Sequence, residues 1–109
     1  MRIHELKQKL EPLQGRRIAK IEDDERQAAM DETMKVINGW RLARVETGTV
    51  KVGKRTMNVH LVFADEAAMP EFRISIRAGD VHKIERWSPG WLGILFKRGH
   101  WSKLRFMGS

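Results

Sequence analysis

Residues 86–105 read RWSPGWLGILFKRGHWSKLR, and this stretch does most to decide the fold of the chain. Its centre is an unbroken apolar run, residues 91–96, with turn-forming residues on both sides at 88–90 and 97–100. A run of six apolar residues between two turns is typical of a strand that is covered on both faces. The stretch therefore predicts a central strand in an antiparallel sheet.

The strand after this run shows a different pattern. Leu104 and Phe106 alternate with Trp101, Lys103 and Arg105. Successive side chains of a strand point to opposite faces of the sheet. We therefore expect the two apolar residues to point into the core and the other three to form an outward face.

The same alternation recurs through the second half of the chain, most clearly at residues 57–63 and 72–76. Glycine-containing turns at 53–54 and 78–80 separate these segments. Residues 40–107 therefore predict about six antiparallel strands in meander order, arranged as a sandwich or roll. With helices expected before residue 40, the fold class is α+β.

Two helices are predicted in the first 39 residues. The first has one apolar stripe at three- and four-residue steps, ends near Pro12 and is followed by Gly15. The acidic run at 22–25 is expected to open the second helix, which Asn38-Gly39 should end. Between them, residues 16–22 fit either a short strand or the start of a helix. The expected buried stripes are Ile3, Leu6, Leu10 and Leu13 in the first helix, and Met30, Thr33, Met34 and Ile37 in the second.

The length of 109 residues predicts one domain, residues 1–109, with 1–39 mostly helical and 40–107 forming the sheet. The chain has no cysteine, which excludes disulfides and thiolate metal sites and suits a reducing compartment. Its longest apolar run is far too short to cross a membrane, and residues 1–10 lack a signal-peptide core. We therefore expect a cytoplasmic protein with no membrane contact.

The net charge of +7 is distributed unevenly. Residues 1–39 hold eight basic and eight acidic side chains, so the whole excess lies in residues 40–109. After Glu85 there are five Lys or Arg residues and no acidic one. Positive charge concentrated in one part of a small domain is typical of a nucleic-acid partner, since phosphate binding releases counterions.

Three of the four tryptophans share this basic region, and tryptophan and basic side chains together can stack bases and hold phosphate. The alternative is that the tryptophans cover the edge of the core and the charges are solvated. The predicted nucleic-acid-binding residues are Lys54, Arg55, Arg86, Trp87, Trp91, Lys97, Arg98, Trp101, Lys103 and Arg105.

No constellation in the sequence indicates catalysis. The four histidines have no metal-ligand spacing, and no serine lies in a nucleophile-elbow context. The sequence therefore predicts a protein that is not an enzyme and needs neither cofactor nor metal.

Three segments resemble the N-terminal β-sandwich domain of the formamidopyrimidine-DNA glycosylases. They are ELKQKLEPLQGRRIAKIE (5–22), INGWRLARVETGTVKVGKRTMNVHLVF (37–63) and IRAGDVHKIERWSPGWLGILF (76–96). The resemblance implies DNA binding, with Lys54 at the DNA-facing turn and residues 88–93 in a six-residue loop.

Several positions depart from that family's pattern. The chain starts Met1-Arg2-Ile3-His4 instead of with the family's catalytic proline and glutamate. Gly90 and Trp91 replace the two arginines of the loop, and no cysteine zinc finger follows. If the kinship holds, base excision is lost and DNA binding alone remains.

Two functions are therefore expected. The first is a non-catalytic bacterial or phage domain that binds DNA or RNA, with DNA favoured. The second is an inhibitor or adaptor that docks on a host protein complex through the same surface, because Trp and Arg dominate protein-interface hot spots.

Overall fold

The segments with alternating apolar and polar residues form strands over most of the chain. The structure is a computed structural model that describes residues 1–52, 54–88 and 90–107. The side chains of residues 49–52, 54–56, 68 and 69 lie outside this description. The strands are β1 (Ile18–Asp23), β2 (Arg41–Val52), β3 (Lys54–Asp65), β4 (Ala68–Arg77), β5 (Val81–Ser88), β6 (Trp91–Phe96) and β7 (Trp101–Phe106). The helices are α1 (Ile3–Leu10) and α2 (Gln27–Ile37), with short 3-10 turns η1 (Glu11–Leu13) and η2 (Ala78–Asp80).

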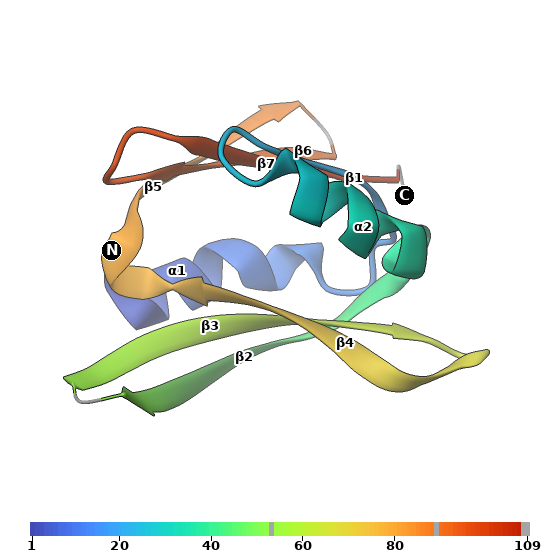
Figure 1. The fold of residues 1–109 in the computed structure, drawn as a ribbon, viewed down its shortest axis with the longest axis horizontal. Helices are drawn as coiled ribbons and strands as arrows, with labels where there is room; N and C mark the ends of the chain where they lie inside the picture. The colour runs from blue at the N-terminus through green and yellow to red at the C-terminus, as the bar shows by residue number, and fades with distance from the viewer. Residues whose placement is uncertain (53, 89, 108–109) are drawn as a thin grey trace.

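The strands form two antiparallel sheets that face each other (Figure 1). One sheet has the order β2-β3-β4 and the other the order β1-β7-β6-β5. The α+β class is confirmed, and residues 40–107 contain six strands as predicted. They do not form one continuous sheet, because η2 separates β4 from β5 and the chain passes there from one layer to the other. The apolar run at 91–96 is the central strand β6, between β5 and β7.

The seventh strand, β1, comes from the part of the chain expected to be mostly helical. It pairs with β7 from Ile18–Phe106 to Asp23–Ser102. Both of its isoleucines, Ile18 and Ile21, are buried. The first and last thirds of the chain therefore share one sheet and one hydrophobic core, which includes residues of both sheets and α1.

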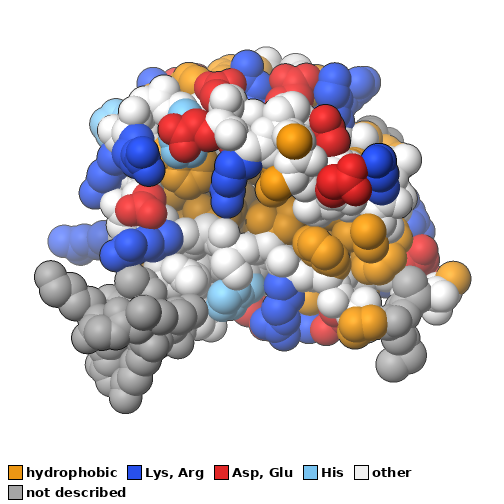
Figure 2. Space-filling view, viewed as in Figure 1, with side chains coloured by type: hydrophobic (Ala, Val, Ile, Leu, Met, Phe, Trp, Pro, Cys, Tyr) orange, Lys and Arg blue, Asp and Glu red, His pale blue; other side chains and the backbone are white. Residues whose placement is uncertain are grey.

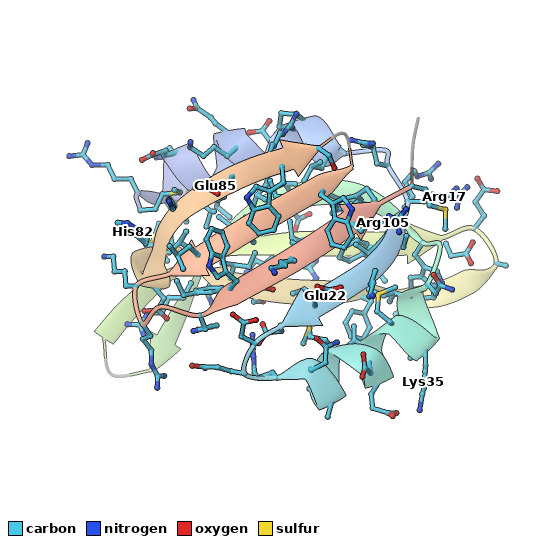
Figure 3. All side chains as sticks on the ribbon, turned by 90° about the horizontal axis from the view of Figure 1, so that it is seen from above. Arg17, Glu22, Lys35, His82, Glu85 and Arg105 are labelled. Atoms are coloured by element: carbon cyan, nitrogen blue, oxygen red, sulfur yellow. The ribbon has the colours of Figure 1, made fainter. Side chains whose placement is uncertain are left out.

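Both helices lie on the inner side of the four-stranded sheet, along opposite edges of it (Figures 1 and 3). Leu6 and Leu10 of α1 are fully buried, and Ile3 packs against the same core. The predicted apolar stripe of the first helix is confirmed. Pro12 lies in η1 and Gly15 follows with a positive φ of 89°, so the helix ends where the sequence indicates.

Helix α2 packs on β1 and begins later than expected. The acidic residues Glu22 and Asp23 belong to β1, because they pair with Lys103 and Ser102 of β7. Asp23 instead holds the turn that leads into α2, as its Oδ1 accepts the backbone N–H groups of Glu25 (2.9 Å) and Arg26 (2.8 Å). Ile37 is buried, whereas Met30, Thr33 and Met34 are half-buried. No helix within the described ranges is long and apolar enough to span a membrane.

Candidate nucleic-acid interface

Both helices lie on the inner side of the four-stranded sheet, so its outer side is open to solvent (Figures 1 and 3). The strand register determines which side chains share this outer side. Arg105 pairs with Trp91, Lys103 with Gly93, and Trp101 with Leu95. Leu104 and Phe106 of the same strand are buried. Trp101, Lys103 and Arg105 therefore point outward, as the alternation in the sequence predicts.

We call this surface the tryptophan face. It consists of Lys20, Glu22, Lys83, Glu85, Trp87, Trp91, Gly93, Leu95, Trp101, Lys103 and Arg105. Figure 3 looks onto it and labels Glu22, Glu85 and Arg105, which come from three different strands.

Two of the indoles meet at the middle of the tryptophan face. The ring centroids of Trp87 and Trp101 are 5.0 Å apart, and the ring planes are inclined by 53°. Both rings lie over Gly93 of the intervening strand. A Cβ atom at Gly93 would be 2.6 Å from Cζ2 of Trp87 and 3.0 Å from Cζ3 of Trp101. Glycine at this position gives the two indoles the space to approach each other.

Each indole also has a cation near its ring. The Nζ of Lys103 is 5.3 Å from the ring centroid of Trp87, and the Cζ of Arg105 is 5.6 Å from that of Trp91. The Nζ of Lys83 is 6.0 Å from the centroid of Trp101. These distances lie within the range at which a cation is attracted to a ring face.

Two carboxylates of the tryptophan face have partners of their own. Glu85 accepts a hydrogen bond from Nε1 of Trp87 at 2.8 Å and pairs with Lys83 at 2.7 Å. The Lys83 ammonium, and after it the Trp87 N–H, lower the pKa of Glu85 below its ordinary value. Glu22 pairs with Lys20 at 3.1 Å.

The remaining cations of the face are Lys103 and Arg105. Within the described residues neither forms an ion pair, so their charges are not neutralised by the protein. Lys103 and Arg105 therefore carry the net positive charge of the tryptophan face, directly beside the indoles.

The ten predicted binding residues do not all lie together. Five do: Trp87, Trp91, Trp101, Lys103 and Arg105. Arg86 pairs with Leu92, whose side chain is buried, and it lines a shallow depression with Lys9 and Pro12 at the α1 side of the sheet. A register shift lies between Arg86 and Ser88, and Arg86 also lines a second depression with Trp87 and Trp91, so it borders the tryptophan face.

Two further regions account for the other four predicted residues. Lys97 and Arg98 are exposed in the β6–β7 turn, at the edge of a cavity between the sheets. Lys54 and Arg55 begin β3 in the other sheet, and their side chains lie outside the described residues. The prediction from sequence did not include Lys83 and Gly93, which also belong to the tryptophan face. Lys83 could have been found from its position next to the apolar Ile84, which predicts that it points outward. Gly93 could have been found as a glycine inside an apolar strand.

The outer side of the three-stranded sheet is charged but largely neutralised. Both guanidinium nitrogens NH1 and NH2 of Arg44 bond Glu71 at 2.7 Å, and its Nε bonds Glu46 at 2.6 Å. Arg73 also pairs with Glu46 at 3.1 Å. The Arg44 guanidinium lowers the pKa of both carboxylates. The excess positive charge is therefore not concentrated on these residues.

One polar pair on the same sheet has a reactive combination of side chains. Nδ1 of His60 is 2.7 Å from Oγ of Ser75. Glu46 is the cross-strand neighbour of His60, but its carboxylate is bound to Arg44 and Arg73. Within the described residues, no group of three or more His, Cys, Asp or Glu side chains is placed to hold a metal ion.

Comparison of the chain with protein-family models, with curated proteins and with solved structures found no match. The resemblance to the formamidopyrimidine-DNA glycosylases therefore stays a hypothesis. The resemblance implies a loop at residues 88–93, of which Pro89 lies outside the described residues. Ser88 ends β5, and Trp91, Leu92 and Gly93 lie in β6, with Leu92 buried in the core.

Proposed function

We propose that the protein is a small non-catalytic domain that binds nucleic acid on the tryptophan face, with unpaired DNA or RNA as the preferred ligand. The observation that carries this proposal is the combination of three exposed or half-exposed indoles with two cations, Lys103 and Arg105, that have no carboxylate partner among the described residues. Contiguous apolar side chains on a surface, rimmed by polar residues, mark an interaction site.

The geometry favours unpaired bases over a duplex. The three indoles come from β5, β6 and β7, and neighbouring strands are spaced by about 4.8 Å. A sheet surface of this width has room for about two or three unpaired bases. Stacking requires a base face that is free, and each stacked base contributes roughly 1–3 kcal/mol.

The cations are placed to hold the phosphates of such a strand. Because Lys103 and Arg105 lie within 5.6 Å of indole centroids, a base stacked on a ring brings its own phosphate into their reach. Bound phosphate would be a better partner for these cations than the weakly attractive ring faces.

The test is the fluorescence anisotropy of labelled single-stranded DNA, single-stranded RNA and duplex DNA, each titrated with protein at several salt concentrations. Replacing Lys103 and Arg105 together by alanine should weaken binding to all sequences. The salt slope should flatten by about 1.5 to 2 units if both side chains contact phosphate. Trp101→Ala should weaken single-strand binding more than duplex binding.

The matched control is Lys9→Ala together with Lys35→Ala, which removes the same charge from exposed positions on α1 and α2. Figure 3 shows Lys35 on the helix and away from the tryptophan face. This control should bind nearly as well as the wild type. Absence of binding to every strand form at low salt would refute the proposal.

A second candidate function is docking on another protein through the same face, as an inhibitor or adaptor encoded by a phage or bacterium. It is favoured by Leu95, a half-exposed apolar side chain between Trp101 and Lys83 in the register, because aromatic and aliphatic side chains together form the apolar centre of a protein interface. A tryptophan-anchored protein interface should weaken only mildly with salt, whereas nucleic-acid binding should weaken steeply.

A further inference from the structure

A cavity of about 580 Å³ lies between the two sheets, beside the start of α2. Its volume is in the range of small-molecule sites. The lining comes from both sheets and from α2: Ile94 and Phe96 from β6, Ile74 and Ile76 from β4, and Met30. Figure 2 shows hydrophobic side chains in the recess between the layers, with Lys and Arg side chains beside them.

The walls of this cavity are apolar and incompletely covered. Ile74 and Phe96 point from inner faces of the two sheets but remain half-exposed, as does Met30. In a closed β-sandwich such residues interdigitate with the opposite sheet and lose contact with water. Here the sheets leave an apolar space that another apolar group could fill.

The rim of the cavity is positively charged. Arg26, Arg77, Lys97 and Arg98 line it, against the carboxylates Glu25 and Asp80. Within the described residues, none of Arg77, Lys97 and Arg98 forms an ion pair. His100 adds an imidazole to the wall, stacked on Phe96 with ring centroids 4.5 Å apart. An apolar interior with a cationic rim fits a ligand with an aliphatic tail and an anionic head.

We propose that the cavity between the sheets binds a small amphipathic anion of the fatty-carboxylate class. The tail lies against Ile74, Ile94 and Phe96, and the carboxylate faces Arg77, Lys97 and Arg98. Burial of the tail contributes about 25 cal/mol for each Å² of apolar surface removed from water. Arg77, Lys97 and Arg98 make a ligand with an anionic head bind more tightly than one with a neutral or cationic head. This site is separate from the tryptophan face, which lies on the outer side of the sheet.

The test compares three probes that share a ten-carbon tail: decanoate, decanol and decyltrimethylammonium, each below its micelle concentration. Binding is followed by chemical-shift changes in two-dimensional NMR spectra of the protein. Decanoate should shift the methyl signals of Ile74 and Ile94, decanol should bind more weakly, and the cationic probe should bind least. The indole N–H signals of Trp87, Trp91 and Trp101 should stay in place.

Two variants separate the head from the tail. Arg77→Ala together with Arg98→Ala removes exposed charges, and it should weaken decanoate binding at least tenfold with decanol binding unchanged. Ile74→Trp should fill the space and abolish binding of both probes, with folding checked from the same spectra. Lys9→Ala together with Lys35→Ala is the control and should bind decanoate as the wild type does. Equal binding of the three probes, or no shift at the cavity residues, would overturn the proposal.

Discussion

The indole rings of Trp87 and Trp101 meet over the backbone of Gly93, with centroids 5.0 Å apart and planes inclined by 53°. This contact joins β5 to β7 across β6, so three strands of the sheet are connected on their solvent side. The pair is therefore part of the fold as well as of the candidate interface, and the two roles can be separated by substitution.

Gly93→Val should destabilise the protein by about 1–3 kcal/mol, as expected for overpacking. The added side chain would overlap both indoles, since its Cβ alone would be 2.6 Å from Cζ2 of Trp87. Val has a higher strand propensity than Gly, but the effect of propensity spans only about 1 kcal/mol, so the overlap should dominate. The measurement is urea unfolding followed by circular dichroism.

Gly79→Ala is the control for this substitution, because a Cβ at Gly79 would meet nothing within 4 Å. It should leave the free energy of unfolding almost unchanged. Equal stability of the Gly93 and Gly79 variants would show that the indoles do not depend on the space above Gly93.

The hydrogen bond from Trp87 to Glu85 should make part of the tryptophan fluorescence depend on acid pH. The pKa of Glu85 is lowered in the folded protein, so its carboxylate stabilises the fold above its ordinary pKa of 4.5. That contribution is lost as the pH falls through the still lower folded pKa. We expect a fluorescence change below about pH 4.5 that is absent in Glu85→Gln, and a stability difference between the two proteins that disappears at low pH. An identical acid profile of both proteins would contradict this assignment.

The strands at residues 40–107 could be predicted from sequence because their alternation is regular, whereas β1 could not. A register shift lies between Ile18 and Lys20, so Ile18 and Ile21 both point inward although they are three residues apart. Three-residue spacing of apolar side chains is also what a helix produces. Only the pairing with β7, whose residues lie 79 to 88 positions further along the chain, distinguishes a strand from a helix here.

The candidate site could be predicted only in part, for a related reason. Alternation within β7 placed Trp101, Lys103 and Arg105 on one face without knowledge of any other strand. Lys83 and Gly93 belong to the tryptophan face because of the register between neighbouring strands. The sequence of a single strand gives no information on that register. The charge excess along the chain likewise gave no information on which cations are bound by carboxylates.

The Arg44 network should control how the three-stranded sheet responds to acid. Arg44 lowers the pKa values of both Glu46 and Glu71, so these carboxylates stabilise the fold above their ordinary pKa and lose that effect as the pH falls through the folded values. In Arg44→Gln both pKa values should rise toward the ordinary value, with a larger rise at Glu71, because Arg44 binds it through two nitrogens. NMR titration of the side-chain carboxyl carbons measures both. If the pKa values of Glu46 and Glu71 were unchanged in Arg44→Gln, Arg73 alone would be responsible for lowering them.

The buried carboxylate of Asp23 should matter more to stability than any exposed charge of α2. The residue is 3% exposed, its Oδ1 accepts two backbone N–H groups, and its own N–H donates to Oε1 of Gln27 at 2.9 Å. Asp23→Ala leaves both N–H donors without their acceptor, which should cost about 1–3 kcal/mol. Asp23→Asn keeps an oxygen at that position and should cost less. Glu32→Ala, at an exposed site paired with Lys35, is the control and should change the urea midpoint little. If Asp23→Ala were as stable as this control, the turn before α2 would have to be held by the pairing of β1 with β7 and not by the aspartate.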